Sequence, residues 1–359
     1  MKSTHPKKMF LNISLLKKAF YVYLFDFIQK THGVLFMKKF LATFLILFLA
    51  LITAACGANN AGSKEGAADQ NTGTSETSAD ETVTVTHSLG KTEVKKYPQK
   101  VIVFDFGALD SLDLMGVDIA GLPKSGTVPP YLEKFTADTY ENVGSLKEPD
   151  FEKLAVIEPD LIIISGRQAE LYEEFTEIAP TISVELDLNN YIESFQNNMR
   201  MLGEIFGKED FVEGELAKID EKIKQVRAEV ESLGENALIV LVNEGKVSAF
   251  GPKSRFGIIH DVLGFIPVDD RIEVTTHGQS ISFEYIVEKN PDYLFVVDRT
   301  AVVGGEGSAQ EVIENDLVKN TTAYQEGKIV YLDPNFWYLS GGGLVSLAEM
   351  INEVGEAIK

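Results

Sequence analysis

The chain of 359 residues contains one cysteine, one tryptophan and five histidines. A single cysteine excludes an intramolecular disulfide framework and any zinc or iron–sulfur site built from several cysteines. Basic residues are also scarce, since 33 lysines and arginines stand against 54 acidic residues, for a formal net charge of −21. Proteins that bind nucleic acid present a basic face to the phosphates, so this balance argues against nucleic acid as a partner.

Motifs of the common hydrolases and nucleotide-binding enzymes are absent as well. The sequence has no Gly-x-Ser-x-Gly elbow, no His-Glu-x-x-His and no Walker loop. Sites for free zinc or manganese gather several histidines and carboxylates, whereas His87, His260 and His277 are scattered. We therefore expect neither an enzyme nor a free-metal binder, and no permanently bound cofactor.

Residues 37–55 have the order of parts of a lipoprotein signal peptide. Met37 and two lysines precede the uncharged apolar run 40–53, and two alanines then precede Cys56. The run is short for a membrane span of about 20 residues, and Thr53 stands where such signals commonly have leucine. We predict that Cys56 becomes the lipidated first residue; the alternative is an uncleaved anchor with a free cysteine. Either interpretation puts the body outside the cytoplasmic membrane.

Two further segments flank this signal. Residues 1–36 precede a complete signal sequence that has its own methionine, so we expect translation to start at Met37. Residues 56–81 contain the cysteine and then small, polar and charged residues almost throughout. Such a composition cannot bury a core, so this segment is predicted to be a flexible tether.

The remaining chain is predicted to form two α/β lobes. At roughly 150 residues per domain the length favours two units, and 45% hydrophobic with 24% charged residues is a globular composition. After a hairpin expected at 82–94, non-alternating apolar runs indicate strands buried on both faces, as in parallel sheets, at 101–104, 161–164, 237–242 and 293–297. We expect an N-terminal lobe over 82–206 and a C-terminal lobe over 235–359.

A helix is predicted over 207–234, between the two lobes. Apolar residues recur there at alternating steps of four and three, at Val212, Leu216, Ile219, Ile223, Val226, Val230 and Leu233. Gly234 suits the C-cap of this helix. The stripe fits a helix lying across two lobes of one chain; the alternative is a coiled-coil dimer, which usually sustains the pattern longer. We expect a monomer.

A repeat at an offset of 132 residues relates the two halves. Phe151-Glu152, Pro159-Asp160 and Arg167 match Phe283-Glu284, Pro291-Asp292 and Arg299. Each copy has a helix, a turn and a strand that ends before its arginine. In open α/β sheets, ligands bind outside the carboxyl ends of the strands, so the two lobes would aim both arginines into one cleft. Arg255 also follows a strand-like segment, and these three are half of the six arginines. The alternative is that each arginine caps its own lobe.

The motifs together resemble the petrobactin-type catecholate siderophore-binding lipoproteins of Gram-positive ABC importers. Besides the signal peptide and tether, the shared segments are 104–107 (FDFG), 143–149 (VGSLKEP), 163–168 (IISGRQ), 252–257 (PKSRFG), 276–280 (THGQS) and 337–343 (WYLSGGG). The resemblance covers nearly the whole chain after Met37. It implies two Rossmann-like lobes joined by one long interlobe helix, the class III substrate-binding protein architecture.

The same resemblance implies roles for the residues of these motifs. The three arginines and Lys147 would contact the oxygens of a ferric catecholate, and Trp337 and Tyr338 would stack on it; for Trp337 the alternative is a core position. His277 and Tyr338 would complete the coordination of iron that a siderophore leaves with two open sites. Flat aromatic surface and guanidinium forks suit such an anion. Other iron chelates, haem or cobalamin are the alternative ligands.

Partners follow from the same resemblance. Glu152 and Glu284 would dock against arginines of a permease dimer that works with an ATPase, and a twofold-repeated acid suits a twofold-symmetric partner. The alternative is that each acid only complements the dipole of its helix. The resemblance implies a protein held by lipid at the extracellular face of the cytoplasmic membrane. Its transported ligand would be the ferric siderophore.

Overall fold

The computed structural model describes residues 81–359, and the predictions for residues 1–80 lie outside this range. The described chain begins with the predicted hairpin, in which β1 (Thr82–His87) pairs antiparallel with β2 (Gly90–Lys95). Val85 and Val94 point from this hairpin into the core. No helix within the described residues is both long and apolar enough to cross a membrane.

The N-terminal lobe is built on a parallel sheet of five strands in the order β5-β4-β3-β6-β7. Its strands are β3 (Val101–Val103), β4 (Gly121–Leu122), β5 (Glu141–Asn142), β6 (Leu161–Ile164) and β7 (Thr181–Ser183). Its helical segments are α3 (Phe106–Leu114), η1 (Pro130–Thr136), α4 (Phe151–Ile157), η2 (Gly166–Leu171), α5 (Tyr172–Thr176) and α6 (Tyr191–Phe206). All residues of β3 and β6 are buried, as their non-alternating apolar runs predicted.

The C-terminal lobe has a second, mixed sheet in the order β11-β9-β8-β12-β13, with β10 beside β8. Its strands are β8 (Asn236–Asn243), β9 (Lys246–Phe250), β10 (Ile266–Pro267), β11 (Gln279–Ile281), β12 (Tyr293–Asp298) and β13 (Ile329–Leu332). Strand β9 runs antiparallel to β8, and β12 runs parallel to both β8 and β13. The helical segments are α8 (Ile258–Asp261), α9 (Phe283–Lys289), α10 (Thr300–Val303), α11 (Ala309–Ile313), η3 (Val318–Asn320), α12 (Thr322–Gln325), η4 (Asn335–Ser340) and α13 (Leu344–Ala357).

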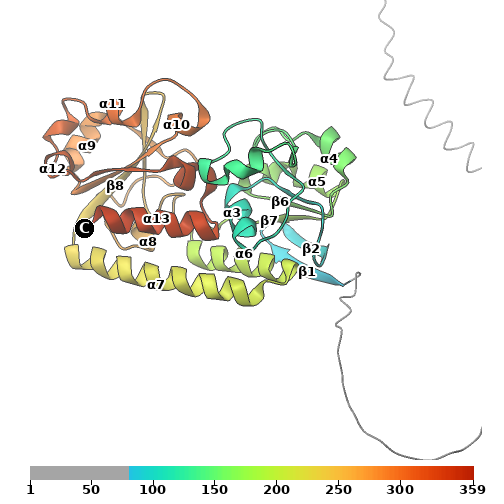
Figure 1. Ribbon diagram of the computed structural model, residues 1–359. Helices are drawn as coiled ribbons and strands as arrows, with labels where there is room; N and C mark the ends of the chain where they lie inside the picture. The colour runs from blue at the N-terminus through green and yellow to red at the C-terminus, as the bar shows by residue number, and fades with distance from the viewer. Residues whose placement is uncertain (1–80) are drawn as a thin grey trace, which may run out of the picture. The chain divides into compact units, whose positions relative to one another are not determined.

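Helix α7 (Glu209–Leu233) runs along both lobes, with α6 and α13 packed against it (Figure 1). Five of the predicted apolar positions are buried, at Val212, Leu216, Ile219, Val226 and Val230. At the end of the stripe, Leu233 is 41% exposed. The helix ends at Gly234, which adopts the predicted left-handed C-cap with a φ of 65°.

The structure repeats the 132-residue duplication in detail. Helices α4 and α9 both end in a left-handed residue, Glu158 with a φ of 53° and Asn290 with a φ of 43°. The Asp160 carboxylate accepts from the backbone N–H groups of residues 99 and 100, just before β3. Asp292 accepts in the same way from the backbone of Asn236, where β8 begins. Each Pro-Asp pair therefore ties the start of the neighbouring strand to its own strand.

Helix α13 closes the chain against the N-terminal lobe as well as the C-terminal one. Its N-terminal N–H groups, from Val345 and Ser346, donate to the two carboxylate oxygens of buried Asp110 on α3, each at 3.1 Å. A Cβ at Gly343 would lie 2.3 Å from the carbonyl oxygen of Gly107. Gly343 therefore lets α13 begin in direct contact with α3.

Candidate functional site

Two adjoining cavities open between the lobes. The larger, which we call the main chamber, has a volume of about 450 Å³ and is lined by both lobes, with Phe106, Lys147 and Arg167 on one side and Arg299 and Val302 on the other. The smaller, the side chamber, has a volume of about 290 Å³. Apart from Lys147, all the residues that line it belong to the C-terminal lobe. Lys147, Arg299 and Tyr338 line both chambers, so the two are parts of one cleft.

Tyr338 stands where three arginines meet. Its carbonyl oxygen accepts hydrogen bonds from Nη2 of Arg167 at 2.7 Å and from Nη2 of Arg255 at 2.9 Å. Nε of Arg299 donates to its phenol oxygen at 2.7 Å. The guanidinium carbon of Arg255 also lies 4.5 Å from the centre of the Tyr338 ring, within cation–π distance.

The repeat explains how two of these arginines come together. Arg167 lies in η2, just beyond the carboxyl end of β6, and Arg299 directly follows β12. Each strand lies between the middle strand and an edge strand of its sheet, so the two arginines stand at equivalent carboxyl ends. Arg255 reaches Tyr338 from the segment between β9 and α8.

Tyr338 itself is presented by η4, a six-residue π-helix. Such segments are rare and occur mostly at functional sites. The π-helix is tied to the N-terminal lobe, because the Ser340 hydroxyl lies 2.6 Å from the phenol oxygen of Tyr131. Ser340 also donates to the carbonyl oxygen of Asn335.

The charges around Tyr338 shift its acidity and that of Arg255. Burial lowers the pKa of Arg255 to about 10, and the neighbouring charge of Arg167 acts in the same direction. Burial alone would raise the pKa of Tyr338. The hydrogen bond from Arg299 and the nearby guanidinium charges outweigh it, so the pKa of Tyr338 lies below its ordinary value. All three arginines are charged at neutral pH.

The walls of both chambers contain cations and no carboxylates. The cations are Lys147, Arg167, Lys246, Arg255 and Arg299. Within residues 81–359, none of these five forms an ion pair with an acidic side chain. In a chain with 21 more negative than positive charges, this cleft is a local concentration of positive charge. It can hold an anion against the repulsion of the whole protein.

A tight turn presents Lys147 to both chambers. The hydroxyl oxygen of Ser145 accepts from the backbone N–H groups of Lys147 and Glu148, and Gly144 pairs with Pro149 across the turn. Gly144 has a φ of 98°, which favours glycine. The Lys147 side chain is exposed and lines both chambers. Its contact with a ligand stays a prediction, as it does for the three arginines.

His277 and Tyr338 both line the side chamber. His277 is exposed, in the loop between β10 and β11. The described residues contain no group of three or more histidine, cysteine, aspartate or glutamate side chains that could hold a metal ion. Completion of iron coordination by His277 and Tyr338 stays a prediction.

Trp337 lines neither chamber and has the core position that was the alternative to stacking on a ligand. Its side chain is 2% exposed and belongs to the core. The indole N–H donates to Oε2 of Glu353 at 2.7 Å, and the ring lies beside Phe256. The π-helix turns consecutive side chains in different directions, so Tyr338 enters the cleft while Trp337 faces α13. Burial raises the pKa of Glu353 to about 7.

Lys246 and Asn243 line the side chamber and were missed in the sequence. They pair across the two-residue turn that joins β8 to β9, so β9 begins where β8 ends. The sequence Asn243-Glu-Gly-Lys246 between two apolar runs is a hairpin signal that could have located them at the carboxyl edge of the sheet.

Glu152 and Glu284 are both exposed in the first turns of α4 and α9. Hydrogen bonds from its own backbone N–H and from Ser282 lower the pKa of Glu284. The two acids therefore occupy matching sites on the two lobes. Their docking to a permease is not tested by this geometry.

Comparison with known proteins identifies what this architecture is similar to. Residues 110–336 match the periplasmic binding protein family. The chain is 50% identical to petrobactin-binding protein YclQ of Bacillus subtilis (strain 168), over 90% of this chain and 100% of that protein. It is 35% identical to the ferric-anguibactin-binding protein FatB of Vibrio anguillarum, over 76% of this chain and 86% of that one.

Solved structures give the same result for the fold. The crystal structure of YclQ superposes with a TM-score of 0.76 at 53% identity, covering 78% of this chain and 99% of that chain. The periplasmic catecholate-siderophore binding protein VctP of Vibrio cholerae superposes with a TM-score of 0.73 at 39% identity, covering 76% and 99%. These likenesses confirm the predicted two-lobed α/β fold with its long interlobe helix.

Proposed function

Because the chain belongs to the periplasmic binding protein family, we propose that it captures a ferric catecholate siderophore of the petrobactin type in its interlobe cleft and delivers it to an ABC importer. The ligand class rests on the 50% identity to a petrobactin-binding protein. The relatives described above are named as binding proteins, which agrees with a protein that performs no chemistry on its ligand.

One observation carries this proposal: the carboxylate-free, cationic lining of the cleft around Tyr338. A ferric catecholate is an aromatic anion whose iron is already largely coordinated by oxygen. It needs guanidinium groups for its oxygens and a ring to lie against, rather than a set of metal ligands. Arg167, Arg255 and Arg299 supply the first, and Tyr338 supplies the second.

For a siderophore that leaves two positions of the iron open, His277 and Tyr338 are the proposed protein ligands. A phenolate is a hard oxygen donor that suits ferric iron, and the lowered pKa of Tyr338 favours its deprotonation on binding. Both side chains line the side chamber.

Delivery requires an anchor and a docking surface. We infer that lipid on Cys56 holds the protein at the extracellular face of the membrane as a monomer. Glu152 and Glu284 then meet cations on the two subunits of a permease dimer that works with an ATPase. The exposure of both acids, on matching helices of the two lobes, supports this docking.

The test is a calorimetric titration of the purified protein with a panel of iron chelates. Ferric petrobactin should bind most tightly, ahead of a ferric hydroxamate, haem, cobalamin and bare ferric citrate. Arg299→Ala should weaken that binding, and Arg200→Ala is the matched control because Arg200 is paired with Glu213 on the surface. Tightest binding of haem, cobalamin or bare divalent metal would contradict the proposal.

A further inference from the structure

The two chambers of the cleft offer different chemistry. The main chamber has apolar walls beside its cations, formed by Phe106, Pro123, Leu146, Val302, Val303 and Leu339. Most of the side chains that line the side chamber are polar or charged, among them Asn243, Lys246, Ser248 and Thr276. A flat aromatic group gains more from the first, because burying apolar surface against water is favourable. A charged or hydroxyl-rich group finds its hydrogen-bond partners in the second.

Positive charge in the side chamber comes from four groups. Lys147 and Arg299 contribute from its border with the main chamber, and Arg255 and Lys246 line the side chamber alone. The side chain of Lys246 is exposed and has no acidic partner within the described residues. Beside it, Oδ1 of Asn243 accepts from Nη1 of Arg299. That bond directs the carbonyl of the amide to the arginine and leaves the amide N–H groups as donors.

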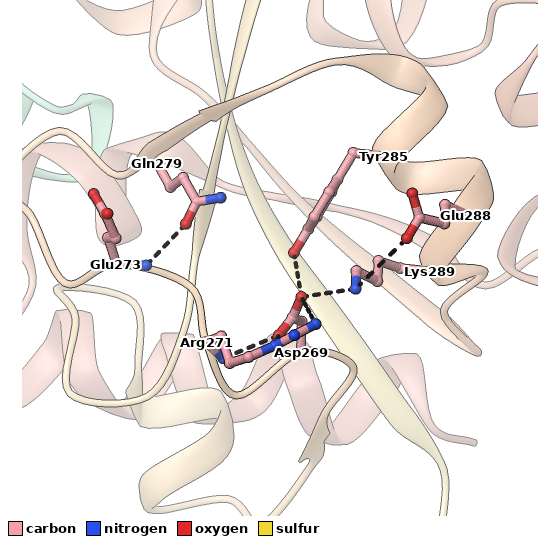
Figure 2. A network of polar contacts seen from close by, with 7 residues as sticks. All are labelled: Asp269, Arg271, Glu273, Gln279, Tyr285, Glu288 and Lys289. Atoms are coloured by element: carbon pink, nitrogen blue, oxygen red, sulfur yellow. Dashed lines mark hydrogen bonds and ion pairs between the residues drawn. The ribbon is translucent and has the colours of Figure 1, made fainter.

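The outer wall of the side chamber is held in place before any ligand arrives. This wall is the loop between β10 and β11, which carries Thr276 and His277. Figure 2 shows how Asp269 anchors the start of the loop: its carboxylate accepts from Nζ of Lys289 at 2.8 Å, from the phenol of Tyr285 at 3.1 Å and from Nε of Arg271 at 3.1 Å.

The far end of the loop is closed by its own hydrogen bonds. Oε1 of Gln279 accepts from the backbone N–H of Glu273 at 2.9 Å (Figure 2). The turn packs tightly on the sheet, because a Cβ at Gly278 would lie 2.6 Å from the ring of Phe250, which also lines the chamber. A wall held at both ends loses little conformational freedom when a ligand binds.

We propose that the side chamber is a second subsite of the cleft, which binds a carboxylate of a chelate whose aromatic part lies in the main chamber. Lys246 is the residue that recognises this carboxylate. The inference rests on the proposed function and adds to it that the preferred ligand is bipartite. At roughly 30 Å³ per water molecule, a chamber of about 290 Å³ holds on the order of ten waters, which is room for a small carboxylate-bearing group.

The experiment compares two synthetic ferric bis-catecholates of equal linker length, one with a carboxylate on the linker and one without it. Calorimetry measures the affinity of each chelate for the unmodified protein and for the variants Lys246→Met and Lys224→Met. Lys224 is the matched control, an exposed lysine on α7 that has no acidic partner among residues 81–359 and lines neither chamber. Thermal unfolding of each variant verifies that it is folded.

The unmodified protein should prefer the carboxylate-bearing chelate by about tenfold, which is about 1.4 kcal/mol. Lys246→Met should remove most of this preference, because it weakens binding of the carboxylate-bearing chelate much more than binding of the other chelate, while Lys224→Met should behave as the unmodified protein. Equal affinity for the two chelates, or an equal loss for both in Lys246→Met, would overturn the subsite and leave the proposed function standing. A folded protein that binds neither chelate would overturn the proposed function and the subsite with it.

Discussion

Arg299 donates a hydrogen bond from Nε to the phenol oxygen of Tyr338, and its guanidinium carbon lies 5.5 Å from the centre of the same ring. The carbonyl oxygen of Tyr338 meanwhile accepts from Arg167, which belongs to the other lobe. One residue thus orients arginines from both lobes. Their remaining N–H groups are available to a ligand in the cleft.

Arg299→Ala should weaken the binding of ferric petrobactin by roughly thirtyfold, since removal of a charge-assisted hydrogen bond in a desolvated site costs about 2 kcal/mol. Arg299→Lys should have an affinity between those of the unmodified protein and Arg299→Ala, because its ammonium keeps the charge but lacks the planar fork. Calorimetric titration measures both. Arg167→Ala and Arg255→Ala should also lose affinity, and the assignment of the cleft fails if all three alanine variants bind as the unmodified protein does.

Trp337 should report the ionisation of Glu353. It is the only tryptophan of the chain, and its indole N–H donates to this carboxylate. Burial raises the pKa of Glu353 to about 7, so tryptophan emission should titrate with a midpoint near that pH. Glu353→Gln should give emission that is flat from roughly pH 5 to pH 9, about two units on either side of that midpoint. A titration that persists in Glu353→Gln would show that another group is responsible.

The raised pKa of Glu353 also predicts how the stability of the protein changes with pH. A raised pKa in the folded state means that the folded protein holds the proton more tightly than the unfolded chain. Its contribution to the free energy of unfolding is complete below the unfolded pKa of roughly 4.3, and it is lost as the pH rises through about 7. Buried Asp110, whose pKa burial also raises to about 7, acts in the same direction. Urea unfolding at a series of pH values should show that the free energy of unfolding declines less with rising pH in Glu353→Gln than in the unmodified protein.

Asp269→Asn should destabilise the C-terminal lobe by about 2 kcal/mol. The Asp269 carboxylate pairs with Lys289 and Arg271 and accepts a hydrogen bond from the phenol of Tyr285. Hydrogen bonding from Lys289 holds the pKa of Asp269 well below its ordinary value. The stabilisation is therefore present above roughly pH 4 and disappears only in stronger acid. Urea unfolding at neutral pH measures it, and exposed Asp270→Asn is the control. Equal stability of the two variants would count against the network.

The double variant Glu152→Lys, Glu284→Lys reverses the charge of both proposed docking residues. It should abolish uptake of radioactive iron from ferric petrobactin by whole cells. The affinity of the purified variant for the chelate should stay unchanged, because both residues lie outside the two chambers. Glu204→Lys with Glu221→Lys, at exposed sites on α6 and α7, controls for the same change in net charge. Normal uptake by the double variant, or loss of ligand affinity, would exclude the docking role.

Local patterns in the sequence were sufficient for the hairpin, for the buried strands β3, β6, β8 and β12, and for the interlobe helix and its end. Four apolar residues in a row at 161–164 predict a strand buried on both faces, because no solvent-facing side remains for a polar residue. Gly234 ends α7 because a left-handed cap strains any residue with a Cβ. The repeat also located Arg167 and Arg299 at equivalent strand ends, since equal spacing along the chain produces equal positions in two similar lobes.

Contacts between distant segments decided what these patterns left open. The indole of Trp337 and the ring of Tyr338 are adjacent in sequence, yet one is buried against α13 and the other enters the cleft. Gly343 serves the contact between α13 and α3, whose residues are more than 200 positions away along the chain. Lys246 belongs to a cationic chamber only because the fold brings Lys147, Arg255 and Arg299 to the same cavity. Burial and charge depend on which surfaces meet in space, and only the folded chain brings these surfaces together.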